Sequence, residues 1–130
     1  MKAGALHAGF GSSDITPRTG VALAGFGPYL NRNSTSVRQP LLARCAALGQ
    51  AEETVVILSL ELVGLSRQLE SAVRARVAEA CRLDPDRLFI ACTHTHSSPQ
   101  TAGHIGWGHA DDLYLETLPG RIVPAVEAAL

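Results

Sequence analysis

The segment TVVILSLELVGL, Thr54 to Leu65, contains the strongest strand signal in this sequence. Its first half is a near-continuous run of β-branched and aliphatic residues, which predicts a strand over residues 54–62. Such runs are typical of strands that are covered on both faces, as in α/β proteins. Glu61 lies in the second half of the segment. A buried carboxylate is costly unless it is paired or metal-bound, so Glu61 is either such a group or a solvated group at the strand end.

An amphipathic helix is predicted directly after this strand, over residues 66–83. Ser66 is a suitable N-cap residue, and Asp84-Pro85 ends the helical pattern. One face of the helix carries apolar residues at every fourth position: Leu69, Val73, Val77 and Cys81.

A further strand is predicted over residues 87–94, because the apolar run that begins at Leu88 follows the helix. Strand, helix and strand together form a βαβ unit, which we expect to be parallel and right-handed. The sequence therefore predicts an α/β fold with a mixed or mostly parallel sheet and flanking helices. In this arrangement Glu61 lies toward the same end of the sheet as the residues that follow the second strand.

Two histidines, His94 and His96, stand where the second strand ends, within the run THTHSSP. Residues i and i+2 of a strand point to the same face. The carboxyl ends of strands border the binding crevices of open α/β sheets. Imidazole is a zinc ligand and also the usual acid or base near neutral pH. A pair at a strand end, flanked by threonines and serines, is therefore explained better by a metal or catalytic site than by two histidines that only pack in the structure.

The remaining segments are less regular. Residues 8–13 are small and glycine-rich, and Asp14 to Pro17 reads as a turn in which Asp14 accepts a backbone hydrogen bond. A polar surface loop is expected over residues 28–39, and a buried strand over residues 41–48.

The last part of the sequence predicts a loop and then a helix. The loop, residues 101–110, contains His104 and His109, which are further candidate ligands. Asp111 and Asp112 lead into the helix, which Pro119 and Pro124 weaken. The apolar face of this helix comprises Leu118, Ile122, Val126 and Leu130.

Composition narrows the class of protein. A chain of 130 residues is expected to form one domain. The net charge is -1 and no basic cluster is present, so nucleic acid is not an expected partner.

No apolar run reaches the roughly 18 residues of a transmembrane helix. The N-terminus lacks a signal-peptide pattern, so a cytoplasmic location is the simplest expectation, with a secreted parent protein left open. Three cysteines without CxxC spacing predict reduced, buried thiols.

Four blocks of this sequence are similar to the N-terminal part of the neutral/alkaline (non-lysosomal) ceramidase family, whose members are zinc-dependent amidases. The most specific block is ACTHTHSSP, residues 91–99. The other blocks are weak alone and useful together: SDITP with the following GV and LAGFG in residues 13–27, PLLAR in residues 40–44, and VVILSLELVGL in residues 55–65.

The resemblance implies a role for three residues. His94 is implied to be a ligand of a catalytic zinc ion. His96 is implied to lie next to the metal and to bind or protonate groups at the reacting amide. Glu61 stands where the family usually has an aspartate that supports the site. The implied activity is hydrolysis of the amide bond of an N-acyl lipid or related compound, with zinc as cofactor.

The resemblance also implies that residues 1–130 form a single α/β domain, the N-terminal portion of a longer catalytic domain. The family's other zinc ligands come from later sequence, so the site is expected to be completed by another chain or by a second copy of this one. Two alternatives remain open. One is a non-catalytic α/β module or fragment that assembles with itself or a partner. The other is a self-contained His-x-His metal hydrolase that recruits His104 or His109.

Overall fold

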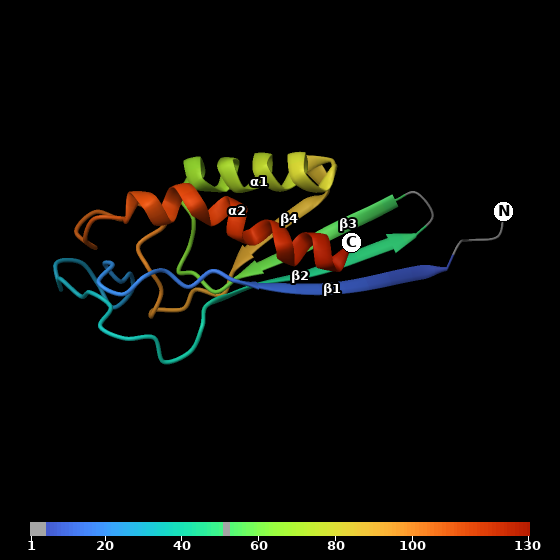
Figure 1. The fold of residues 1–130 in the computed structure, drawn as a ribbon. Coiled ribbons are helices and arrows are strands. Elements are labelled where there is room, and N and C mark those ends of the chain that lie inside the picture. The colour runs from blue at the N-terminus through green and yellow to red at the C-terminus, as the bar shows by residue number, and fades with distance from the viewer. Residues whose placement is uncertain (1–4, 51–52) are drawn as a thin grey trace.

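A mixed four-stranded sheet with both helices on one of its faces forms the core of the molecule (Figure 1). The computed structural model describes residues 5–50 and 53–130. The strand order is β1-β2-β3-β4; the β1-β2 and β2-β3 pairs are antiparallel and the β3-β4 pair is parallel. In chain order the elements are β1 (Leu6–Asp14), β2 (Leu42–Gln50), β3 (Glu53–Leu60), α1 (Arg67–Cys81), the 3-10 turn η1 (Pro85–Arg87), β4 (Leu88–Cys92) and α2 (Asp112–Ala129).

The predicted βαβ unit is confirmed as β3, α1 and β4, with shorter elements than the sequence indicated. Strand β3 ends at Leu60, and β4 ends at Cys92. Helix α1 begins as expected, because the Ser66 hydroxyl accepts a hydrogen bond from the Leu69 N–H at 3.2 Å. The helix ends where Arg82 adopts a left-handed conformation with φ 52°.

Strand β1 contains the small, glycine-rich segment 8–13, whose composition does not favour a strand. The glycines are explained by the closeness of α2. A Cβ atom at Gly9 would lie 1.9 Å from the carbonyl oxygen of Ala129, and one at Gly11 would lie 2.1 Å from that of Ala125. The expected turn follows the strand, with the Asp14 carboxylate accepting the Thr16 N–H at 2.7 Å.

Helix α2 continues through Pro119 and Pro124. Each proline removes one helical N–H donor, and burial of the apolar face offsets this loss. Three members of the predicted face, Leu118, Ile122 and Val126, are fully buried. The assignment of Leu130 to that face was wrong, since this residue is 54% exposed. Neither helix in the described part of the chain has the length and apolarity needed to span a bilayer.

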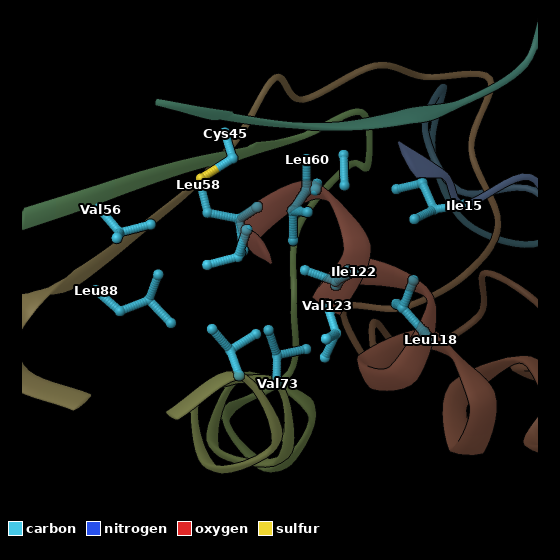
Figure 2. Packing of buried hydrophobic residues seen from close by; sticks show 14 of the residues in the cluster. Ile15, Cys45, Val56, Leu58, Leu60, Val73, Leu88, Leu118, Ile122 and Val123 are labelled. Carbon is cyan, nitrogen blue, oxygen red and sulfur yellow. The ribbon is translucent and has the colours of Figure 1, made fainter. Parts of the chain in front are cut away.

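The core fills the layer between the sheet and the two helices (Figure 2). Alternate residues of β3, such as Val56 and Leu58, point into this layer and are fully buried. Their neighbours Val55 and Ile57 point to the other face and are 38% and 44% exposed. The expectation that this strand is covered on both faces was therefore wrong for the described residues, because α1 and α2 pack on the same side.

The three cysteines are free thiols. Cys45 is buried, which raises the pKa of its thiol to about 11. Cys81 and Cys92 are half-buried, so the expectation of burial applies fully only to Cys45.

Candidate functional site

The histidine pair follows the C-terminal end of β4, but it does not continue the strand. Strand pairing stops at Cys92, and His94 adopts a left-handed conformation with φ 61°. Two backbone hydrogen bonds hold the segment beside the end of β3. The Thr93 N–H donates to the Leu60 carbonyl oxygen, and the His94 N–H donates to the Leu62 carbonyl oxygen. The imidazole rings of His94 and His96 lie side by side, with centroids 5.0 Å apart and planes at 74°. The predicted pairing of the rings is confirmed, although strand geometry is not its cause.

The tautomer of His94 is set by the backbone. Its Nδ1 atom lies 2.7 Å from the carbonyl oxygen of Val63. Because a carbonyl oxygen can only accept a hydrogen bond, Nδ1 is the protonated nitrogen. In the neutral imidazole the lone pair is then on Nε2, and the residue is exposed. A histidine whose one nitrogen donates to a carbonyl and whose other nitrogen is free has the usual arrangement of a metal ligand.

Ser98 fixes the position of Val63. The Ser98 hydroxyl accepts the Val63 N–H at 2.9 Å and donates to the Thr95 carbonyl at 3.3 Å. Ser98 is completely buried. Sequence reasoning missed the roles of Ser98 and Val63, because both depend on backbone groups whose partners are visible only in the folded chain.

His96 packs against a loop that the sequence did not link to the site. The Phe26 ring meets the His96 ring edge to face, with centroids 5.2 Å apart. Gly25, at φ 98°, lets the loop approach closely, since a Cβ there would lie 2.5 Å from the His96 Cβ. The Arg32 guanidinium lies over the Phe26 ring, 4.6 Å from the ring centroid. The surroundings of His96 are therefore aromatic and cationic.

Glu61 is paired with a neighbouring strand. It follows β3 directly, its side chain is 23% exposed, and its carboxylate binds the Arg44 guanidinium and the Leu42 N–H. Desolvation alone would raise the pKa of Glu61. The hydrogen bonds from Arg44 and Leu42 outweigh this effect, and the pKa lies below its ordinary value. Glu61 is therefore a paired, ionised carboxylate near neutral pH.

A cavity of about 640 Å³ lies beside the sheet end. Glu61 lines it together with Thr93, Thr95 and Ser97, and the loop of residues 33–41 forms much of its wall. The two histidines are not among the lining residues. Glu61 and the histidine pair thus lie at the same end of the sheet, as predicted, but they border different spaces.

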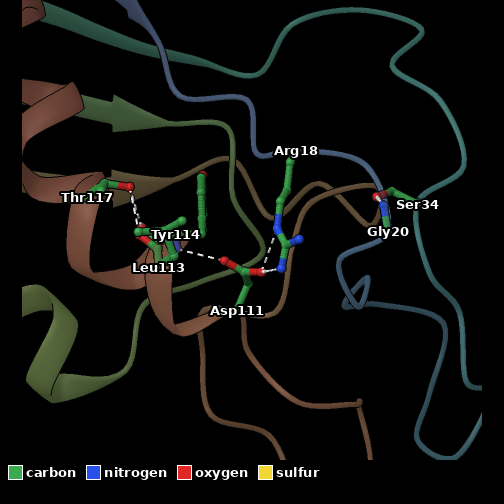
Figure 3. Close-up of polar contacts among 7 residues, drawn as sticks. All are labelled: Arg18, Gly20, Ser34, Asp111, Leu113, Tyr114 and Thr117. Carbon is green, nitrogen blue, oxygen red and sulfur yellow. Dashed lines mark hydrogen bonds and ion pairs between the residues drawn. The ribbon is translucent and has the colours of Figure 1, made fainter.

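Polar contacts at the start of α2 fix the loops around this end of the molecule (Figure 3). The Asp111 carboxylate caps α2 by accepting the Tyr114 N–H at 2.8 Å. Arg18 donates to the same carboxylate from Nε at 3.1 Å and from Nη2 at 2.6 Å. These hydrogen bonds lower the pKa of Asp111. Nearby, the Gly20 N–H donates to the Ser34 hydroxyl and joins two loops.

The loop histidines do not join His94 and His96 in a ligand cluster. His104 packs on Trp107, with ring centroids 4.6 Å apart, and His109 lines a separate cavity of about 340 Å³. Within residues 5–50 and 53–130, no group of three or more histidine, cysteine, aspartate or glutamate side chains is placed to hold a metal ion. His94 has the arrangement of a metal ligand, but the described residues do not supply the three protein ligands of a catalytic zinc site.

Comparisons with known proteins give a structural match. No protein-family model and no curated protein matches the chain. The neutral ceramidase from Pseudomonas aeruginosa superposes with a TM-score of 0.82 at 20% identity, over 95% of this chain and 21% of that one. A ceramidase complexed with C2 gives a TM-score of 0.80 at 19% identity, with the same coverage. This chain therefore has a neutral ceramidase-like fold and spans about a fifth of the length of the ceramidase chains it matches.

Proposed function

We propose that this chain carries part of the active site of a zinc-dependent hydrolase that cleaves an N-acyl bond, with His94 as a metal ligand. The observation that carries the proposal is the hydrogen bond from His94 Nδ1 to the Val63 carbonyl oxygen; His94 is exposed, and no residue among 5–50 and 53–130 hydrogen-bonds its Nε2. The likeness of the fold to two ceramidases supports the same assignment.

His94 supplies one donor atom, and the other ligands come from outside the described residues. Zinc, when bound, makes a bound water more acidic and polarises a scissile carbonyl. Residues 1–130 would then be the N-terminal portion of a longer catalytic domain, or one chain of an assembly in which a partner or second copy completes the site.

His96 is proposed to bind or protonate groups at the reacting amide. Its ring lies 5.0 Å from that of His94, centroid to centroid, and the edge-to-face contact with Phe26 fixes its position. Glu61 is proposed to support the site from the adjacent strand end. As an ionised carboxylate bound to Arg44 and to the Leu42 N–H, it joins β2 to the end of β3.

The proposed substrate is an N-acyl lipid or a related amide. The two matching structures are ceramidases, and the aromatic surroundings of His96 suit a substrate with apolar parts.

A non-catalytic module that assembles with itself or a partner is the second candidate. The observation that favours it is the lack of a three-residue ligand group within residues 5–50 and 53–130. The self-contained metal hydrolase has less support, because within residues 5–50 and 53–130 neither His104 nor His109 forms a group of three possible ligands with the histidine pair.

Zinc binding tests the proposal. Since the described residues supply one donor atom, we expect the purified chain to bind added zinc weakly, measured by calorimetric titration without dialysis, and the variant His94→Ala to bind it more weakly still. His7→Ala is the matched control, since His7 is an exposed histidine of β1. Equal zinc binding by the wild type and His94→Ala would exclude His94 as a ligand, and no binding by either protein even at high zinc concentration would favour the non-catalytic module.

A further inference from the structure

Four large apolar side chains protrude from two loops beside the histidine pair. Phe26, Tyr29 and Leu30 are 66%, 74% and 53% exposed, and Ile105 is 88% exposed. We refer to these four residues as the apolar loop patch.

The two loops of the patch contact each other directly. The Tyr29 N–H donates to the Gly106 carbonyl at 2.5 Å. A Cβ atom at Gly106 would lie 2.9 Å from the Tyr29 ring and from the Pro28 side chain. At the other end, Phe26 contacts the His96 ring. The patch therefore extends from the histidine pair to Ile105.

The backbone that presents these side chains is strained. Phe26, Tyr29 and Asn31 adopt left-handed conformations, with φ 64°, 61° and 48°. This region favours glycine, and bulky residues enter it at an energetic cost. Burial does not offset that cost, because the rings of Phe26 and Tyr29 are mostly exposed. Strain of this kind persists mainly at functional sites, so it indicates that the exposed rings serve a ligand.

Composition and shape identify the class of that ligand. Residues 25–35 and 101–110 include no aspartate or glutamate, and Arg32 lies over the Phe26 ring. Aromatic and aliphatic side chains beside a basic residue are typical of segments that lie in a membrane interface. Hot spots for protein partners, in contrast, lie in well-packed pockets. A side chain as exposed as Ile105 suits insertion into a soft apolar phase.

We propose that the apolar loop patch docks on a lipid surface that contains anionic headgroups. Its contact with His96 then brings the amide of a membrane-resident lipid next to the histidine pair, an inference that rests on the proposed function.

Vesicle binding tests this surface, with the metal chelated throughout. The probe is a vesicle of phosphatidylcholine and phosphatidylglycerol, and binding is measured by cosedimentation. Trp107 is the single tryptophan of the chain and lies two residues after Ile105, so its fluorescence reports insertion as a blue shift. We expect the wild type to bind these vesicles. The double variant Leu30→Ser/Ile105→Ser should bind them with an affinity at least roughly tenfold lower.

Phe89→Ser is the matched control, because Phe89 is 59% exposed on the open face of the sheet. It should bind vesicles like the wild type. No binding by the wild type would overturn the proposal, as would a loss confined to Phe89→Ser. Vesicle binding by a chain that does not take up zinc would support the docking surface while contradicting the proposed hydrolase. Zinc uptake without vesicle binding would support the proposed hydrolase and contradict the docking surface.

Discussion

At the scale of single residues, the candidate site depends on a short chain of hydrogen bonds through Val63. Its carbonyl accepts from His94, and its N–H donates to Ser98. The sequence made the two histidines recognisable, because their spacing and their position after an apolar run are visible in one dimension. It could not identify Val63 or Ser98, since their roles arise from backbone groups that meet only after folding.

Removing the Ser98 hydroxyl tests this chain of contacts. Ser98→Ala leaves the buried Val63 N–H without its acceptor, which costs about 1–3 kcal/mol of unfolding free energy. Urea unfolding at neutral pH measures the change. The exposed neighbour Ser97 is the matched site, and Ser97→Ala should stay within about 0.5 kcal/mol of the wild type. An equal loss of unfolding free energy in both variants would contradict the role of Ser98 in holding Val63.

The conformation of His94 shows where strand-based reasoning reached its limit. The sequence predicted that His94 and His96 point the same way because both belong to a strand. In the structure the strand has already ended, and a left-handed residue brings the rings together. Periodicity identifies repeating structure, but it does not identify a single residue with an unusual φ.

At the scale of elements, apolar runs predicted the strands β2, β3 and β4, and apolar faces with helical spacing predicted α1 and α2. Strand β1 was not assigned, because its glycines are unfavourable for a strand and are required only by the closeness of α2. A long-range contact therefore decided the composition of this strand, which a local pattern cannot reveal.

Two glycine substitutions should have opposite effects on stability. A Cβ at Gly11 would lie 2.1 Å from the carbonyl oxygen of Ala125, whereas one at Gly120 of α2 would meet nothing within 4 Å. We expect Gly11→Ala to destabilise the protein by about 1–3 kcal/mol. Gly120→Ala should stabilise it by up to about 1 kcal/mol through helix propensity. Thermal unfolding monitored by circular dichroism measures both, and a tolerated Gly11→Ala would contradict the close packing of α2 on β1.

At the scale of the whole molecule, three carboxylates act together to make stability depend on acid pH. The pKa of Asp14 is lowered by hydrogen bonds from Thr16, and that of Asp111 by the hydrogen bond from Arg18. The pKa of Glu61 is also lowered, because hydrogen bonds from Arg44 and Leu42 exceed the effect of desolvation. The unfolded chain therefore binds more protons than the folded one in the acid range.

These lowered pKa values determine in which direction stability changes with pH. Stability is fully present above the unfolded pKa values of about 4, and it is lost as the pH falls through the lower folded values. Urea unfolding at neutral pH and near pH 3 should show this loss, and Glu61→Gln should make it smaller. Glu116→Gln, at an exposed position of α2, should leave the loss unchanged. A wild type equally stable at both pH values would contradict the account.

The whole-molecule fold agrees with the family resemblance seen in the sequence, since two ceramidases superpose on nearly the entire chain. The open face of the sheet was not predicted. A β-branched run indicates that a strand is apolar on both faces, but it does not show that the described residues cover both.

If His94 offers Nε2 to a metal ion, nitrogen-15 NMR of the histidine rings will detect it. We predict that, without metal, His94 carries its proton on Nδ1, and that added zinc selectively shifts the resonance of His94 Nε2. A proton on Nε2, or a zinc titration that leaves this resonance unchanged, would contradict the account.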